Sequence, residues 1–235
     1  MRRRGWLIFG LSATLLAVGV VVLVVLFSDK ETVGLRIAAV GGDAKAQFML
    51  GRFYGLGAGV KQDFKKAAAW YRRAAEKGHS EAQYCLGVCC DNGEGVEQDR
   101  GEAIRWYRKA AEQGFYRAQY DLGVCYYLGK GVEQDFKEAF AWFLKAAEQD
   151  DFHAQFYVGV CYEYGNGVEM DLEKAAEWYR KAAGQRYVYA QYNLGVCYYN
   201  GRGVKKAPEE AVKWFQKAAE QGLPQAREVL KELGY

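Results

Sequence analysis

The sequence repeats at a fixed interval of 36 residues, and this period constrains the fold more than any other feature. An alanine, a glycine and a tryptophan each recur in register. The alanine column is Ala46, Ala82, Ala118, Ala154, Ala190 and Ala226; the glycine column is Gly51, Gly87, Gly123, Gly159 and Gly195; the tryptophan column is Trp70, Trp106, Trp142, Trp178 and Trp214. A period of this length is typical of an α-solenoid or of a β-propeller.

The spacing within one unit distinguishes these two folds. Ala46, Leu50 and Tyr54 follow one another at intervals of four residues, and Ala67 and Ala74 are seven apart. Both spacings place side chains on one side of an α-helix, whereas a strand would alternate apolar and polar residues. Each unit is therefore predicted to be a helix pair, helix A and then helix B. The glycine that recurs inside helix A indicates a close contact between helices, because glycine there costs about 1 kcal/mol relative to alanine.

A Gly-x-Gly-Val segment links helix A to helix B in every unit. The segments are residues 57–60, 93–96, 129–132, 165–168 and 201–204. Glycine-rich loops also bind phosphate, but this one follows a helix and lacks a Gly-Lys-Ser/Thr sequence, so we interpret it as a turn. In four units an aspartate stands where the N-cap of helix B is expected: Asp63, Asp99, Asp135 and Asp171. The fifth unit has Ala207 followed by Pro208, which favours a helix start by a different route.

The repeated string resembles the Sel-one-like repeat, a relative of the tetratricopeptide repeat. It reads Ala-x-x-x-Leu-Gly-x-x-Tyr-x-x-Gly-x-Gly-Val-x-x-Asp-x-x-x-Ala-x-x-Trp-Tyr-x-x-Ala-Ala and is nearly unbroken over residues 118–147. The resemblance covers about residues 33–235. It implies an all-α fold, a right-handed α-solenoid of helix-turn-helix repeats that serves as a scaffold for protein complexes and not as an enzyme. We expect a partial helix B at residues 33–42, five full repeats from about 43 to 222, and a capping helix A at residues 223–235.

Residues 6–27 form a run of 22 residues without a charge. A helix of this length spans roughly 33 Å, enough to cross a hydrocarbon core of about 30 Å. A cleaved signal peptide has an apolar region of only about 7–15 residues and a small-x-small cleavage site, and no such site closes this run. We therefore expect an uncleaved transmembrane helix at residues 6–27, preceded by a basic tip at 1–5 and followed by a short linker at 28–32.

The arginines before this run predict its orientation. Arg2, Arg3 and Arg4 precede it, whereas lysine and arginine are sparser after it. The positive-inside rule then places the N-terminus in the cytoplasm and the array on the outer side of the membrane, periplasmic or lumenal. These three arginines also account for the whole net charge of +3, so the array has no basic field for nucleic acid, and we expect no nucleic-acid partner.

Side chains suited to catalysis are scarce. His79 and His153 are the two histidines, too few for a catalytic zinc site, and both lie near the predicted B-to-A turns, where we interpret them as solvated loop residues. Ser12, Ser28 and Ser80 are not followed three positions later by lysine, as serine β-lactamases require. We therefore expect no catalytic residue, no cofactor and no bound metal.

The cysteines are predicted to be small apolar core residues without disulfides. Cys89, Cys125, Cys161 and Cys197 form one column of helix A, with Cys85 and Cys90 as additions. Equivalent positions on stacked helices lie about 8–10 Å apart, beyond the Cα limit of roughly 7 Å for a disulfide. Cys85 and Cys89 have a spacing that suits a metal, but no second pair or histidine cluster supports such a site.

A cysteine-rich branch of the resembled family carries a disulfide in each repeat, and some of its members are described as β-lactamases. Its cysteine columns hold alanine and glutamine here: Ala75, Ala111, Ala147, Ala183 and Ala219, and Gln83, Gln119, Gln155 and Gln191. A β-lactam hydrolase of that branch is therefore only a remote alternative.

Helix A is apolar on two sides, which indicates either burial all round or a binding surface. The columns that begin at Phe48, Arg52 and Gly55 point away from Ala46. The simpler interpretation is that the first two pack between successive A helices. The third column varies and mixes acids with tyrosines, and helix A lines the groove of the related tetratricopeptide fold. We therefore predict a partner-binding surface in the concave groove at Asp91, Tyr127, Glu163 and Tyr199, with Tyr120 and Tyr192 beneath them.

Two functions of different classes fit this surface. The first is a membrane-anchored scaffold that binds a protein or peptide partner. The second is a cell-envelope module that binds a cell-wall sugar or peptide, because aromatic side chains serve either kind of ligand. Affinity for isolated glycan fragments would distinguish the second from the first.

Overall fold

The computed structural model describes residues 29–235, with side chains from residue 33 onward. These residues form twelve α-helices and no strand. They divide into two compact units, one ending at Ala110 and the other beginning at Ala111. The predicted transmembrane helix at residues 6–27 lies outside the described residues. Within residues 29–235, no helix is both long and apolar enough to span a bilayer.

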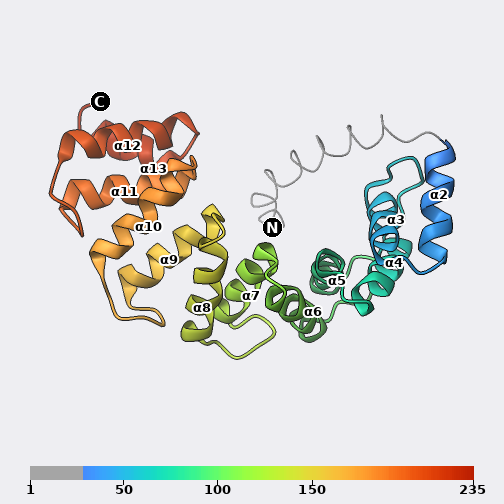
Figure 1. Cartoon of the computed structure of the whole chain (residues 1–235). Helices are drawn as coiled ribbons and strands as arrows, with labels where there is room; N and C mark the ends of the chain where they lie inside the picture. Colours follow the sequence, from blue (N-terminus) through green and yellow to red (C-terminus); the bar gives the residue numbers. More distant parts are fainter. Residues whose placement is uncertain (1–28) are drawn as a thin grey trace, which may run out of the picture. The chain divides into compact units, whose positions relative to one another are not determined.

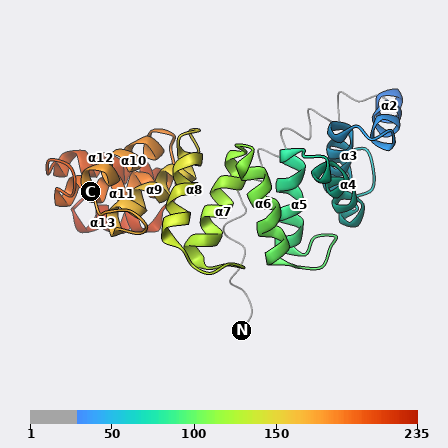
Figure 2. The same cartoon turned by 60° about the horizontal axis from the view of Figure 1, so that its bottom comes forward.

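The helices follow one another in pairs, as the repeat pattern predicts. The first unit contains α2 (Asp29–Val40), α3 (Ala44–Leu56), α4 (Phe64–Glu76), α5 (Ser80–Asn92) and most of α6 (Arg100–Glu112). The second contains α7 (Tyr116–Leu128), α8 (Phe136–Ala147), α9 (Phe152–Tyr164), α10 (Leu172–Gly184), α11 (Val188–Asn200), α12 (Pro208–Glu220) and α13 (Pro224–Glu232). In the second unit each helix packs against the next one in the chain (Figures 1 and 2). Odd-numbered helices from α3 are the A helices and even-numbered ones the B helices, which confirms the all-α repeat architecture.

The first helix starts earlier than the sequence indicates. α2 begins at Asp29, so residues 29–32, which the sequence analysis assigns to the linker, are helical. They contain no glycine or proline that would prevent a helix from starting there. The capping helix is present at the other end as α13.

Side chains cap the B helices as predicted. Asp63 Oδ1 accepts a hydrogen bond of 2.9 Å from the backbone N–H of Lys66, which satisfies one of the free amides at the start of α4. The same type of bond is made by Asp99, Asp135 and Asp171. In the fifth repeat no side chain caps α12, and Pro208 occupies its first turn.

Two B helices end without the glycine that their equivalents have. Asp150 and Arg186 take its place after α8 and α10, and both adopt the left-handed conformation, with φ of 64° and 66°. Residues with a Cβ atom pay about 1–2 kcal/mol for this conformation, and asparagine or aspartate tolerates it better than most. The left-handed turn is therefore kept at a cost in conformational free energy, and this cost is larger for Arg186 than for Asp150.

The glycine column of helix A receives an aromatic ring from helix B of the same repeat. A Cβ atom added to Gly123 would lie 2.6 Å from Cδ1 of Phe143, and one added to Gly159 would lie 2.7 Å from Cδ1 of Tyr179. The other pairs are Gly51 with Tyr71, Gly87 with Tyr107 and Gly195 with Phe215. The predicted close helix contact is thus confirmed, and the rings of Phe143 and Tyr179 are fully buried in it.

The second glycine of the Gly-x-Gly turn touches the preceding repeat. Gly167 has a φ of 77°, and a Cβ atom there would overlap the Phe136 carbonyl group at the start of α8. Gly165, the first glycine of the same turn, has a φ of 70° but more room, since the nearest atom to an added Cβ is the Cβ of Met170 at 3.6 Å. One glycine is thus needed for its conformation alone, and the other also for close approach to a neighbouring backbone.

A buried glutamine in each repeat links helix A to the repeat before it and, in the second unit, to the turn after it. Gln155 Nε2 donates to the Ala147 carbonyl at 3.3 Å, and Gln155 Oε1 accepts from Gln185 Nε2 at 3.0 Å. The Ala147 and Gln155 columns are those in which the cysteine-rich branch has its cysteines. The hydrogen bond from Gln155 to Ala147 therefore joins the two columns that hold cysteine in that branch. Equivalent glutamines are Gln47, Gln83, Gln119 and Gln191.

The first of these glutamines differs from the rest. Lys77 stands at the position that donor glutamines occupy in later repeats, and its ammonium group binds the Gly42 carbonyl instead. Gln47 still donates to the Ala39 carbonyl at 3.0 Å, but its buried Oε1 has no hydrogen-bond partner among the described residues. The first repeat thus lacks one bond that Gln119, Gln155 and Gln191 have.

Candidate functional site

The predicted partner-binding residues lie on the A helices. Four of them occupy the last position but one of their helix, next to the Gly-x-Gly turn: Asp91 in α5, Tyr127 in α7, Glu163 in α9 and Tyr199 in α11. Tyr120 and Tyr192 lie seven residues before Tyr127 and Tyr199 in the same helices. Asp91 belongs to the first unit and the other five to the second.

Tyr127 is held by the following repeat. Asn166 Nδ2 donates a hydrogen bond of 3.0 Å to the Tyr127 hydroxyl. The Tyr127 ring lies 5.2 Å from that of Phe136 and 5.8 Å from that of Tyr157, both edge-on. Burial raises the pKa of Tyr127 above its ordinary value. The side chain therefore contributes to packing as well as to the surface, and replacing it with alanine would also loosen the core.

Glu163 has its charge compensated within the chain. It accepts a hydrogen bond of 2.5 Å from the Tyr179 hydroxyl and forms an ion pair of 3.0 Å with Arg202 Nη1. Its side chain is only 11% exposed. Glu163 therefore orders the end of α9 and offers little free charge to a partner.

Tyr120 and Tyr192 lie within the helix layers. The Tyr120 ring contacts those of Phe143, His153 and Tyr157 at centroid distances of 6.0, 5.5 and 5.9 Å, and burial raises its pKa. Tyr192 packs on Phe215 at 5.6 Å. This column thus packs between helices, in line with the simpler interpretation of the sequence.

Tyr199 and Asp91 remain accessible. Tyr199 exposes 38% of its surface at the C-terminal end of α11. Asp91 is partly exposed at the end of α5, where its carboxylate lies 3.5 Å from Arg100 Nε. In the second unit Tyr199 is therefore the predicted site residue that a partner can reach without displacing other side chains.

The structure adds a contact that sequence reasoning missed. The variable residue of the Gly-x-Gly turn binds the site residue that precedes it by 39 positions: Asn166 binds Tyr127, and Arg202 binds Glu163. A hydrogen-bond donor faces a tyrosine hydroxyl in one repeat, and a cation faces a carboxylate in the next. The sequence contains a sign of this contact, because the residue 39 positions after each site residue is chemically complementary to it. The two flanking glycines favour interpreting that residue only as part of a turn.

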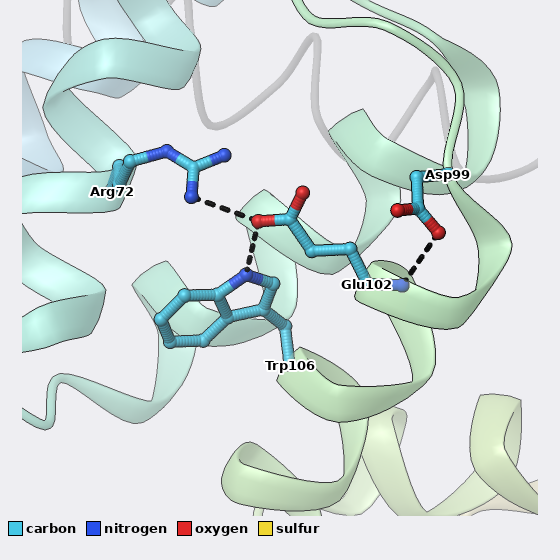
Figure 3. A network of polar contacts seen from close by, with 4 residues as sticks. All are labelled: Arg72, Asp99, Glu102 and Trp106. Atoms are coloured by element: carbon cyan, nitrogen blue, oxygen red, sulfur yellow. Dashed lines mark hydrogen bonds and ion pairs between the residues drawn. The ribbon is translucent and has the colours of Figure 1, made fainter.

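The first unit holds an ordered polar network on its B helices. Glu102 Oε1 accepts hydrogen bonds from Arg72 Nη1 at 2.8 Å and from Trp106 Nε1 at 3.1 Å, while Asp99 caps the Glu102 backbone N–H (Figure 3). The bond from Arg72, then that from Trp106, lowers the pKa of Glu102. An open polar depression of about 580 Å³ adjoins it, lined also by residues 96–100. The charge of Glu102 is thus compensated by Arg72 within the chain, and the lowered pKa makes this carboxyl group a poor proton donor.

The histidines are more buried than the sequence suggests. His79 is the N-cap of α5, where its Nδ1 accepts from the Ala82 N–H at 3.3 Å and its ring stacks on Phe48 at 4.7 Å. His153 lies in the first turn of α9, and burial lowers its pKa. The interpretation of both as solvated loop residues is therefore wrong, because aromatic columns that pack between helices also cover these turns.

None of the six cysteines forms a disulfide; five are buried and Cys85 is half-buried. Burial raises the pKa of Cys89 and Cys161 to about 12 and that of Cys90 and Cys197 to about 11. The thiols of the core are thus held in their neutral, unreactive form. Residues 29–235 contain no group of three or more histidine, cysteine, aspartate or glutamate side chains placed to hold a metal ion.

The chain is built of successive helix pairs. In each pair a Gly-x-Gly turn joins the two helices, and a glycine of helix A packs against an aromatic ring of helix B. This arrangement defines an α-solenoid repeat protein. The Sel1 repeat model matches residues 44–79, 80–115, 117–151, 152–187 and 188–223. The chain therefore belongs to the Sel1 repeat family, as its resemblance implied.

Solved structures of this family are similar to the chain. One is c5321, a protective antigen of uropathogenic Escherichia coli with an SLR fold, which is 42% identical with a TM-score of 0.80 over 83% of this chain. Another is a Sel1 repeat protein of Oxalobacter formigenes, 37% identical with a TM-score of 0.72 over 79% of this chain and 76% of its own. The match spans 42% of the length of the E. coli antigen. A search of curated protein sequences gave no match.

Proposed function

We propose that this chain is a non-catalytic, membrane-anchored scaffold whose repeat array binds a protein or peptide partner. The repeats support the binding role, because Sel1 repeat proteins are generally protein-interaction scaffolds. The uncharged run at residues 6–27 supports the anchor, since its length suits a bilayer. Arg2, Arg3 and Arg4 support a cytoplasmic N-terminus and an array on the outer, periplasmic or lumenal, side.

The exposed ring of Tyr199 carries the binding proposal. It lies in the same column as Tyr127 and Glu163, which the following repeat fixes in place. A partner that lies along the ends of α7, α9 and α11 would meet a preordered row with one accessible aromatic anchor. Tyrosine binds at a low entropic cost because it has only two rotatable side-chain bonds, so such anchors dominate many interfaces.

The binding test compares two tyrosines on the same helix. Proximity labelling from the anchored array first identifies the partner. Tyr199→Ala should then weaken its capture at least tenfold, because truncating an aromatic anchor costs about 2 kcal/mol or more. Tyr189→Ala is the matched control, since Tyr189 is 52% exposed but lies at the other end of α11. Tyr127→Phe removes the hydroxyl while keeping the ring contacts, and so tests the row without opening the core.

Equal binding by Tyr199→Ala and the wild type would refute this placement. Affinity for isolated cell-wall glycan fragments, lost in Tyr199→Ala, would instead support the envelope-module function. Topology is tested separately with a reporter fused after Tyr235. Activity only on the outer side of the membrane is expected, and activity only in the cytoplasm would refute the orientation.

A further inference from the structure

The first helix of the array carries an apolar stripe that the repeat stack leaves uncovered. Val33, Ile37 and Val40 expose 55%, 68% and 76% of their surface. They are spaced by four and three residues, so they lie along one side of α2. Leu35 and Ala39 pack instead against the core formed with α3. The exposed stripe therefore plays no part in joining α2 to the array.

The same face is polar in most of the other B helices. The residues 36, 72, 108, 144 and 180 positions after Ile37 are all cations, and four of the five after Val40 are glutamates. The columns are Val33, Ala69, Arg105, Ala141, Glu177, Lys213, then Ile37, Arg73, Lys109, Lys145, Lys181, Lys217, then Val40, Glu76, Glu112, Glu148, Gly184, Glu220. The face that is exposed to solvent in α4, α6, α8, α10 and α12 is thus apolar in α2.

The cations in the column of Ile37 also make a cation–π contact with a tryptophan of their own helix, and α2 has no such contact. In α4 the guanidinium of Arg73 lies 4.5 Å from the centroid of the Trp70 ring, and the lysines of the other B helices cover their own tryptophans at 3.8–4.3 Å. In α2 the position of the tryptophan is Gly34. Loss of the ring explains why a cation is not needed at residue 37, but it does not explain an exposed isoleucine flanked by two exposed valines.

Position in the chain indicates what covers the stripe. Phe27, the last residue of the uncharged run, is two residues before the start of α2. Two extended residues reach about 7 Å, and the four helical rises from Asp29 to Val33 add about 6 Å. The stripe therefore begins within about 13 Å of the end of that run. Each interfacial layer of a bilayer is roughly 5–8 Å thick, so a helix tethered this closely can lie in it.

We propose that Val33, Ile37 and Val40 contact the outer interface of the bilayer that residues 6–27 span, so that α2 (blue in Figure 1) lies on the membrane and fixes how the array stands on it. This inference rests on the anchor proposed above. Interfacial helices bury an apolar side about 5–10 Å deep and keep charge at its margin. Arg36 is exposed and adjoins the stripe, where its guanidinium can reach lipid phosphate.

The test uses the full-length protein in vesicles of phosphatidylcholine and phosphatidylglycerol. An environment-sensitive fluorescent amino acid replaces Ile37 in one sample and Arg73, its equivalent one repeat later, in the other. Flotation of the vesicles in high salt reports the anchor. Quenching by brominated lipids reports contact of the labelled position with the bilayer. The helix content of each sample is checked by circular dichroism.

We expect both proteins to float and the label at position 37 to be quenched at least about threefold more than the label at position 73, because only α2 lies in the interface. Flotation with equal or absent quenching at position 37 would overturn the inference and leave the anchor intact. Absence of flotation would overturn both. Crosslinking of two molecules through a photoreactive amino acid placed at position 37, without lipid quenching of the fluorescent label there, would assign the stripe to a second copy of the chain and overturn the lipid contact.

Discussion

Exchanging one glycine for alanine in a single turn separates two contributions to the stability of the array. Gly165 and Gly167 lie two residues apart with φ of 70° and 77°, so alanine meets the same conformational penalty at both. That penalty is about 1–2 kcal/mol for a residue with a Cβ atom. Only at Gly167 would the new methyl group also overlap a backbone carbonyl, that of Phe136 in the preceding repeat.

The difference in free energy follows from this overlap. Inserting a methyl group into a filled space typically costs about 1–3 kcal/mol, and a carbonyl of the helix start cannot rotate away as a side chain can. Gly165→Ala should therefore destabilise by about 1–2 kcal/mol and Gly167→Ala by about 2–5 kcal/mol. For a chain of this size each kcal/mol lowers the melting temperature by about 2–4 °C.

Thermal and urea denaturation followed by circular dichroism measure both variants beside the wild type. Midpoints are the quantity to compare, because repeat arrays depart from two-state unfolding. The larger shift should belong to Gly167→Ala. Equal shifts would show that the turn does not rest on the preceding helix and would refute the repeat-to-repeat contact described above.

Three further predictions concern Arg186, Glu102 and the six cysteines. Arg186→Gly should raise the melting temperature by about 2–4 °C, since it relieves about 1 kcal/mol of left-handed strain; a lower melting temperature would contradict the φ of 66°. Arg72 and Trp106 lower the pKa of Glu102, so its ionised form stabilises the fold above the ordinary carboxyl pKa, and this stability is lost as the pH falls through the lowered value. Glu102→Gln should therefore lose less stability than the wild type between neutral pH and pH 3, as measured by urea midpoints. Denatured, non-reduced protein should titrate six free thiols, whereas the native protein should react slowly apart from Cys85; two or more disulfides would refute the helix register.

Most of the fold could be predicted because the residues that determine helix packing and helix starts recur in successive repeats. The glycine and alanine columns specify close helix contacts in all five repeats, and aspartates specify the start of helix B in four of them, so these recurring signals define the helix pairs. The family resemblance adds the solenoid arrangement to this pattern. Single events were harder to predict. The early start of α2 has no equivalent in another repeat that would indicate it. The glycines equivalent to Asp150 and Arg186 indicate a left-handed residue at that position, but the two side chains themselves do not.

The candidate site was predicted less completely than the fold. Helical periodicity places Tyr127, Glu163 and Tyr199 on one column, and the structure keeps them at equivalent positions. Periodicity does not reveal how much of each side chain the next repeat covers. Asn166 and Arg202 decide that, through contacts 39 residues away along the chain. Tyr199 therefore differs from Tyr127 for reasons that lie outside its own helix.

The buried side-chain oxygen of Gln47 lacks a hydrogen-bond donor within residues 29–235, and this affects where the repeats first separate when the array unfolds locally. In the second unit every buried glutamine is held on both sides, so separating two repeats there breaks bonds made by its amide and by its carbonyl oxygen. At the first repeat, Lys77 binds the Gly42 carbonyl, and the oxygen of Gln47 already lacks a partner. Water that enters this joint gains a hydrogen bond instead of replacing one. Amide hydrogens of α2 and α3 should then exchange with solvent sooner than those of α9 and α10, so that the array frays from its N-terminal end.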